Sequence, residues 1–261
     1  MSDAELEPDS LERLVPDELA AGDATGRETF ELHVARYAFA ARRLPPGRVL
    51  DLACGVGYGS RILVRESASP VSVLGVDVSP AAIAYARERY ADDRVAFAVG
   101  DAMSFADAAG FDAIVSLETF EHLDDPAGFG ARLVGLLRPG GVLVASVPTT
   151  PSVDLNPHHR HDFSEASFRR LFEGFRVVEQ GCLRQLQPVR PVAVLRRREA
   201  RMGELRRNLP AWYARHPLAL ARRLGATLRY GFCNRYITIA WQSPGGPAPG
   251  ETGCPIPDAC C

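Results

Sequence analysis

Lysine is absent from this sequence: all 30 of its basic residues are arginine, set against 32 acidic residues for a formal net charge of −2. Such a bias is typical of GC-rich coding rather than of a mechanism. The near balance hides a segregation of charge along the chain. Residues 184–235 hold 13 arginines against Glu199 and Glu204, a local net charge of +11, which leaves −13 on the remainder. One region is therefore built to face anions or water.

Cysteine is scarce as well. The six cysteines stand at positions 54, 182, 233, 254, 260 and 261. They are too few and too scattered for a disulfide scaffold, and none forms the Cys-x-x-Cys pair of a structural zinc site. Small domains stabilised by disulfides or by a structural zinc ion are therefore excluded.

Long apolar runs are also missing. Although 46% of the 261 residues are apolar, no stretch approaches the roughly 18 to 20 consecutive apolar residues of a membrane span. The N-terminus is acidic, unlike the basic start of a secretory signal, with Asp3, Glu5, Glu7 and Asp9 in its first ten positions. We therefore expect a folded, cytoplasmic protein with no membrane span.

Apolar segments alternate with helical patterns through most of the chain. Strands are predicted over 48–54, 71–78, 95–101, 111–118, 141–148, 176–182 and 236–242. Helices are predicted over 30–41, from the glycine-rich turn to Arg65, after Ser79, up to the stop at 138–141, and from Ser164 through Leu171. Continuous apolar strands that alternate with helices predict an α/β fold with a mostly parallel sheet covered on both faces.

This pattern divides the chain into three parts. Residues 1–28 form an acidic, weakly patterned segment, and residues 29–242 form the α/β domain. Within that domain, leucines at roughly helical spacing predict an Arg-rich insertion of two or three amphipathic helices at about 184–235. The tail over 243–261 is rich in proline and glycine and is expected to be disordered.

A glycine-rich turn and three carboxylates suggest a nucleotide-like ligand. Asp51 ends the first strand and Gly55 and Gly57 follow it, while Asp77 and Asp101 end the next two strands. Ligands of open α/β sheets bind at this edge, and Asp77 is correctly placed to accept hydrogen bonds from ribose hydroxyls. A dinucleotide fingerprint would need glycine at position 60, which is serine, so an NAD-dependent oxidoreductase is disfavoured. The plain alternative is that these carboxylates only end strands or cap helices.

The sequence resembles the class I S-adenosylmethionine-dependent methyltransferases. The resemblance covers about residues 27–182 and the strand near 236–242. It rests on five segments in family order, VLDLACGVGYG, VDVS, GDAMSF, VSLETFEHLDDP and LLRPGGVLVASVP. It implies a Rossmann-like, seven-stranded sheet whose last strand is antiparallel.

The same resemblance implies where S-adenosylmethionine binds. Asp51, Gly55 and Gly57 would surround its methionine part, Asp77 would bind the ribose, and Asp101 with Ala102 would lie at the adenine. Val78 and Leu117 complete the expected cofactor contacts. The segment GRETFELHVARYAFAA looks like an N-terminal cover helix, from which Tyr37 would lean over the cofactor, although an aromatic residue on a helix is more often plain core.

A cluster of acidic and histidine residues follows the fourth strand. If the chain turns helical there, Glu118, Glu121 and His122 share one face, and such oxygen and nitrogen ligands suit Mg²⁺ or another divalent cation. The pattern resembles the metal-binding E-x-x-E-H of small-RNA and ubiquinone-pathway O-methyltransferases, which makes His159 the fourth candidate ligand. Two alternatives stay open: His159 as a metal-free general base, with His122 and Glu118 near the reacting atoms, or a structural cluster.

These observations predict an enzyme that methylates a hydroxyl of a saccharide or secondary metabolite. An N-methyltransferase of a small amine and a non-catalytic cofactor-binding homologue are the alternatives. The basic insertion suggests a phosphorylated or lipid-linked acceptor, peripheral contact with a membrane, or a homodimer face. Nucleic acid is not expected, because these arginines lack the interleaved aromatic residues of a base-stacking platform.

Overall fold

The computed structural model describes residues 14–19, 24–189, 205–206 and 208–245. A seven-stranded sheet in the order β3-β2-β1-β4-β5-β7-β6 forms its centre. The strands are β1 (Gly47–Leu52), β2 (Val71–Asp77), β3 (Val95–Val99), β4 (Phe111–Leu117), β5 (Leu137–Pro148), β6 (Val178–Pro188) and β7 (Cys233–Gln242). The first five run parallel and β7 is antiparallel to both of its neighbours. The predicted fold class, with its antiparallel last strand, is confirmed.

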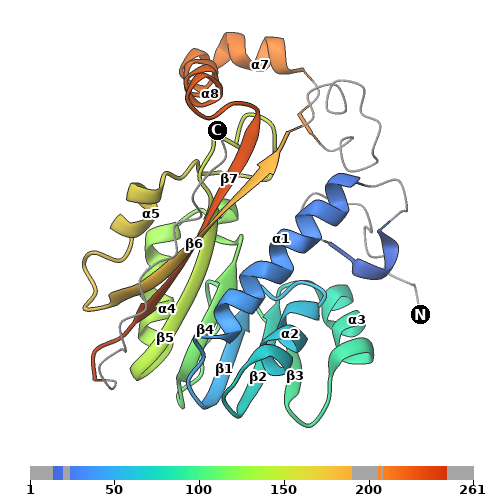
Figure 1. Cartoon of the computed structure of the whole chain (residues 1–261), viewed down its shortest axis with the longest axis vertical. Coiled ribbons are helices and arrows are strands. Elements are labelled where there is room, and N and C mark those ends of the chain that lie inside the picture. The colour runs from blue at the N-terminus through green and yellow to red at the C-terminus, as the bar shows by residue number, and fades with distance from the viewer. Residues whose placement is uncertain (1–13, 20–23, 190–204, 207, 246–261) are drawn as a thin grey trace.

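Helices cover both faces of the sheet (Figure 1). They are α1 (Ala24–Ala41), α2 (Tyr58–Glu66), α3 (Pro80–Tyr90), α4 (Pro126–Leu136), α5 (Glu165–Arg170), α7 (Leu209–Arg215) and α8 (Pro217–Tyr230), with short 3₁₀ turns at η1 (Pro16–Glu18) and η2 (Phe120–His122). The first three pack on one face through residues such as Leu63 and Ile83, and α4 and α5 pack on the other through Phe129 and Phe168. This division explains why strands buried on both faces read as continuous apolar runs.

Two helix starts follow their sequence signals. The Ser79 hydroxyl accepts a hydrogen bond from the Ala82 amide, with Pro80 in the first turn of α3. Ser164 and Ser167 form a reciprocal capping box at the start of α5. Both side chains satisfy amide groups that have no partner within the helix.

Three boundaries differ from the prediction. The first helix begins at Ala24 rather than at 30, so the acidic segment is shorter. The fourth helix ends at Leu136, and β5 begins at Leu137 instead of 141 because Leu137 pairs with Phe111 and the Arg138 side chain is bonded to Asp112. Pairing across the sheet therefore overrides the Pro-Gly-Gly stop signal.

The Arg-rich insertion is shorter than predicted. Strand β6 continues to Pro188 and β7 starts at Cys233, so Arg184 and Arg235 lie in strands. Two helices, α7 and α8, occupy the part that the structure describes, beyond the ends of β6 and β7 (Figure 1). Arg223 of α8 and Tyr213 of α7 both bond to the buried carboxylate of Asp154, which fixes this pair of helices on the loop after β5. The arginines at 196–198 and most of the predicted tail lie outside the described residues.

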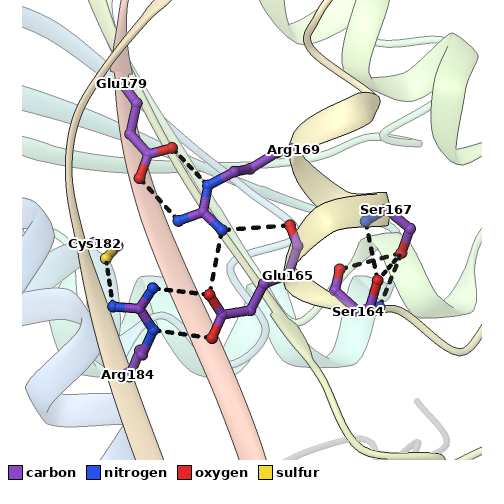
Figure 2. Close-up of polar contacts among 7 residues, drawn as sticks. All are labelled: Ser164, Glu165, Ser167, Arg169, Glu179, Cys182 and Arg184. Carbon is purple, nitrogen blue, oxygen red and sulfur yellow. Dashed lines mark hydrogen bonds and ion pairs between the residues drawn. The ribbon is translucent and has the colours of Figure 1, made fainter.

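Four charged residues join α5 to β6 at the protein surface (Figure 2). We call them the α5–β6 network; they are Glu165, Arg169, Glu179 and Arg184. Arg169 binds Glu179 through two nitrogens at 2.7 and 2.9 Å, and Arg184 binds Glu165 through two nitrogens at 2.9 Å. The network ties a six-residue helix to the outermost strand of the sheet.

Candidate active site

The glycine-rich segment from β1 into the start of α2 leaves no room for a side chain at Gly57 or Gly59. Gly57 has a φ of +86°, and a Cβ there would lie 2.6 Å from the Cβ of Ala86. A Cβ on Gly59 would lie 1.9 Å from Cζ of Tyr37. Glycine is therefore required at both positions, the first by its backbone conformation and the second by the tyrosine ring above it.

Asp77 connects this turn to the end of β2. One carboxylate oxygen accepts a hydrogen bond from the amide of Gly55, and the other accepts one from the amide of Ser79, both at 2.9 Å. The residue is only 7% exposed. The carboxylate thus holds the glycine turn at the sheet edge where we expected the ribose to bind.

A cavity of about 330 Å³ opens at the carboxyl ends of the parallel strands. Seven of the predicted cofactor residues line it: Tyr37, Gly55, Asp77, Val78, Asp101, Ala102 and Leu117. The other lining residues include His33, Met103 and Thr119, which were not assigned to the cofactor from the sequence. The cavity thus gathers most of the predicted cofactor set from five separate segments of the chain.

Asp51 and Gly57 do not line this cavity. Asp51 is fully buried, where its carboxylate accepts hydrogen bonds from the Ser60 hydroxyl at 2.6 Å and the Tyr37 hydroxyl at 3.3 Å. Burial is the main reason that the pKa of Asp51 is raised to about 7. Asp51 therefore acts through Tyr37, and the serine at position 60 has a specific role in holding it.

A second cavity, of about 240 Å³, adjoins the first. The two share Leu14, His33, Glu118 and His122 in their walls. The second cavity also contains Glu121 and His159. It lies where an acceptor molecule would have to approach a ligand bound in the first cavity.

Three of the four predicted ligand residues come together in this wall. One donor atom each from Glu121, His122 and His159 lies within 4.8 Å of the other two. The rings of His122 and His159 meet edge to face with centroids 4.7 Å apart. A 2.7 Å hydrogen bond between the Ser152 hydroxyl and Nδ1 holds His159. The predicted convergence of Glu121, His122 and His159 is therefore present in the structure.

Glu121 is the buried member of this cluster. It is 1% exposed, and its Oε2 accepts no hydrogen bond from the described residues. Burial, followed by the nearby charge of Glu118, raises the pKa of Glu121 to about 8. A buried carboxylate oxygen without a donor is costly by itself, which makes this atom a candidate for binding something else.

Glu118 lines the second cavity together with the other three residues, but it is not part of the group of possible ligand atoms that Glu121, His122 and His159 form. The chain forms a 3₁₀ turn over η2 rather than an α-helix starting at Glu118, whose φ of +50° is rare for a residue with a side chain. Its carboxylate accepts a 2.7 Å hydrogen bond from the Ser146 hydroxyl. Glu118 is thereby turned toward β5 and α1.

The neighbour of Glu118 on α1 is Arg36, a residue that sequence reasoning missed. Its Nη1 lies 3.6 Å from Oε1 of Glu118, and the residue is 1% exposed in the wall of the second cavity. Nothing in the sequence distinguishes this arginine, since every basic residue is an arginine. The position before Tyr37 on the predicted helix was the only signal.

Comparison with known proteins agrees with this arrangement. Residues 50–145 match a family described as a methyltransferase domain. Over 175 residues the chain is 33% identical to a probable S-adenosylmethionine-dependent methyltransferase of Mycolicibacterium smegmatis, an alignment that spans 64% of each protein. A ubiquinone biosynthesis O-methyltransferase of Azorhizobium caulinodans is 35% identical over 124 residues, 46% of this chain and 47% of that protein. Among solved structures, the YcgJ protein of Bacillus subtilis superposes with a TM-score of 0.63 at 15% identity, covering 83% of this chain and all of that one.

These matches support the predicted resemblance to the class I S-adenosylmethionine-dependent methyltransferases. The matched segment runs from β1 to β5 and contains the glycine turn, Asp77, Asp101 and the Glu118 to His122 turn. The chain spans about two thirds or less of the length of these two curated relatives. The residues that line the second cavity from α1 and from beyond β5 lie outside this matched segment.

No helix in the described part of the chain is both long and apolar enough to span a membrane.

Proposed function

We propose that this protein transfers the methyl group of S-adenosylmethionine to a hydroxyl oxygen of a small acceptor, a saccharide or a secondary metabolite. The observation that carries the proposal is the pair of adjoining cavities. The first has the carboxylate of Asp77 at a glycine turn, the second contains Glu121 and His159, and Glu118 and His122 line both. A cofactor site that shares a wall with a site for proton transfer is what a methyl transfer to oxygen requires.

The first cavity fits S-adenosylmethionine through its polar groups. Asp77 presents a carboxylate, fixed by two backbone amides, to the ribose hydroxyls. Asp101 and Ala102 are assigned to the adenine end, with Tyr37 as a cover held in place by Asp51. The missing Cβ atoms of the glycine turn let the backbone approach the ligand closely.

Methyl transfer is an in-line displacement at a sulfonium, so the chain has to align the acceptor oxygen, exclude water and accept a proton. His159 is our candidate for the general base, because Ser152 fixes its ring in the wall of the second cavity. His122 lies at the border of the two cavities and is placed to orient the acceptor. Little covalent chemistry is left for the side chains.

Glu121, His122 and His159 also fit a divalent cation. Their possible ligand atoms lie within 4.8 Å of one another. Oε2 of Glu121 is buried and accepts no hydrogen bond from the described residues. Such a cation, Mg²⁺ or Mn²⁺, would lower the pKa of the acceptor hydroxyl. Two readings of the cluster follow, a metal site of three side chains or a metal-free base with Glu121 protonated.

One experiment tests the function and separates these readings. Incubation with methyl-labelled S-adenosylmethionine and a panel of sugars, phenols and amines should label a hydroxyl compound. EDTA should abolish turnover and Mg²⁺ or Mn²⁺ restore it if the cluster binds a metal, whereas a metal-free base should be insensitive to EDTA. Labelling of amines alone would favour the N-methyltransferase alternative, and tight cofactor binding without labelling would favour a non-catalytic homologue.

Matched variants identify the proton acceptor. His159→Ala should lower kcat by about 10² to 10⁴, the range for loss of a general base. His158→Ala is the control, since His158 is exposed and does not line either cavity. Equal kcat in the two variants would remove His159 from the chemistry.

The predicted phosphate or lipid group of the acceptor stays a prediction. Within the described residues of the insertion, Val189 and Leu205 line the second cavity, but the arginines of α7 and α8 do not. A phosphorylated or lipid-linked acceptor, a cytoplasmic location and a homodimer are thus predictions without further support. Membrane contact keeps one supporting feature, the exposed leucines 218, 224 and 228 of α8 beside Arg222 and Arg229.

A further inference from the structure

We propose that Arg36 binds a carboxylate group of the acceptor, so that the substrate of this enzyme is a hydroxy acid. The inference rests on the proposed function, because it concerns the occupant of the second cavity. Its basis is a buried guanidinium that is held rigidly on one side and whose other side has no hydrogen-bond partner among the described residues. The matched family segment at 50–145 does not include this residue, and no role was predicted for it from the sequence.

The guanidinium of Arg36 is fixed by contacts from the far edge of the sheet. Its Nε donates a 2.8 Å hydrogen bond to Oε1 of Gln185 on β6, and the amide nitrogen of Gln185 in turn donates to the Leu32 carbonyl of α1. The guanidinium carbon lies 4.3 Å from the ring centroid of Tyr236 on β7. Stacking and the Nε bond set both the plane and the direction of the group.

The other end of the guanidinium has unused donors. Neither Nη1 nor Nη2 donates a hydrogen bond to any described residue, although Arg36 is 1% exposed and lines the second cavity. The 3.6 Å approach of Nη1 to Glu118 balances the charge without making a hydrogen bond. A buried charged group that makes too few hydrogen bonds costs free energy. The fold therefore retains two donor nitrogens on Arg36 to which a ligand can hydrogen-bond.

The surrounding charges select the class of ligand. Arginine presents two parallel N–H groups that match the two oxygens of a planar carboxylate. The carboxylate of Glu118 stands in the same cavity wall, 3.6 Å from Arg36, and would repel a doubly charged phosphate more strongly than a singly charged carboxylate. The cavity of about 240 Å³ suits a compact molecule that places its carboxylate on Arg36 and its hydroxyl at His159.

Pairs of acids and their amides test this inference directly. We would titrate 4-hydroxybenzoate against 4-hydroxybenzamide, and glucuronic acid against glucuronamide, into protein loaded with S-adenosylhomocysteine, using calorimetry. Within at least one pair, the acid should bind at least about tenfold more tightly than its amide, since a bidentate charge-assisted contact is lost in the amide. Equal binding within both pairs, or no binding of any probe at millimolar concentration, would overturn the inference.

Two variants assign the preference to the residue. Arg36→Gln should abolish the preference for the acid, and Arg36→Lys should retain only part of it because an ammonium lacks the planar fork. Arg42→Gln is the matched control, an exposed arginine just past the end of α1 that does not line either cavity. Retention of the full acid preference in Arg36→Gln would contradict the proposal.

The same measurements separate this inference from the proposed function. Binding of S-adenosylhomocysteine to the wild-type protein reports on the methyltransferase site alone. If that binding is absent, the proposed function fails; if it is present while acids and amides bind alike, only the role of Arg36 fails. An unchanged affinity of Arg36→Gln for S-adenosylhomocysteine shows that the variant is folded.

Discussion

The Arg36–Glu118 pair and the α5–β6 network use the same two residue types in opposite ways. In the pair, the guanidinium is buried, the closest nitrogen-to-oxygen distance is 3.6 Å, and two nitrogens donate no hydrogen bond within the described residues. In the network, side chains that are 27–41% exposed make bidentate contacts of 2.7 to 2.9 Å (Figure 2). The charged groups with complete hydrogen bonding thus lie at the surface, where water could replace these bonds. The Arg36 guanidinium, whose hydrogen bonding is incomplete, lies where water cannot reach it.

The carboxyl pKa values follow the same division. Hydrogen bonds from Arg184 hold the pKa of Glu165 in the network below its ordinary value. Burial raises the pKa of Glu121 to about 8 and that of Asp51 to about 7. The charged groups of the network stabilise the fold. The buried carboxyl groups of Glu121 and Asp51 have raised pKa values, which are typical of groups that take part in binding or proton transfer.

The largest effect is expected when the buried pair is broken on one side. Glu118→Gln leaves the buried guanidinium without its neighbouring carboxylate, so the free energy of unfolding should fall by about 3 kcal/mol, measured by urea denaturation. The double variant Arg36→Met, Glu118→Gln removes both charges and should recover at least half of that loss. A loss well under 1 kcal/mol in the single variant would mean that water reaches Arg36 and that the pair resembles the network after all.

The next prediction concerns the pH dependence of stability. Because the pKa of Asp51 is higher in the folded than in the unfolded protein, its contribution to stability is complete below about pH 4 and is lost as the pH rises through 7. Between pH 5 and 7 this amounts to about 2 kcal/mol. Unfolding of Asp51→Asn, compared with the wild-type protein at both pH values, should be less pH-dependent by that amount. Identical slopes would place the Asp51 carboxylate in a solvated setting.

The part of the site that sequence predicts well is the part carried by local signals. Gly55 and Asp77, which both line the first cavity, are identified by their distances from predicted strand ends, and parallel strands deliver such residues to one edge of the sheet. The ends of α4 and β5 are not predictable in this way, because the pairing of Leu137 with Phe111 depends on the assembled sheet. Strand pairing, which forms only when the sheet assembles, therefore overrides the local turn signal.

Arg36 illustrates the opposite limit. Its role depends on Gln185, which is 149 positions away, and on Tyr236 from the antiparallel strand. The likeness of the Glu118 to His122 segment to a ligand motif was a local signal; Glu121 and His122 lie in the group of possible ligand atoms, and Glu118 lies in the same cavity wall but outside that group. Whether a side chain turns toward the cluster or toward α1 depends on neighbours such as Ser146 that local spacing does not contain.

The third prediction concerns the affinity of the first cavity for S-adenosylhomocysteine. Asp77→Ala removes a buried carboxylate that is assigned to two ribose hydroxyls and that also holds the amide of Gly55. Charge-assisted hydrogen bonds of this kind are worth roughly 1.5 to 3 kcal/mol each, so affinity for S-adenosylhomocysteine should fall at least about tenfold. Calorimetry checks the affinity, and near-ultraviolet circular dichroism checks that the fold is retained. Unchanged affinity would remove the main support for the cofactor site.

The smallest effect is expected in the α5–β6 network. Arg184→Gln removes a bidentate contact with Glu165 whose partners are 41% and 27% exposed. Partly exposed ion pairs contribute about 0.2 to 1 kcal/mol, because water solvates both groups once the pair is broken. The loss in unfolding free energy should shrink further in 1 M NaCl, where the Debye length is about 3 Å. Affinity for S-adenosylhomocysteine should not change, since Arg184 does not line either cavity. A loss above 2 kcal/mol that persists in salt would show that saturation of a contact, rather than its burial, decides how strongly the molecule depends on it.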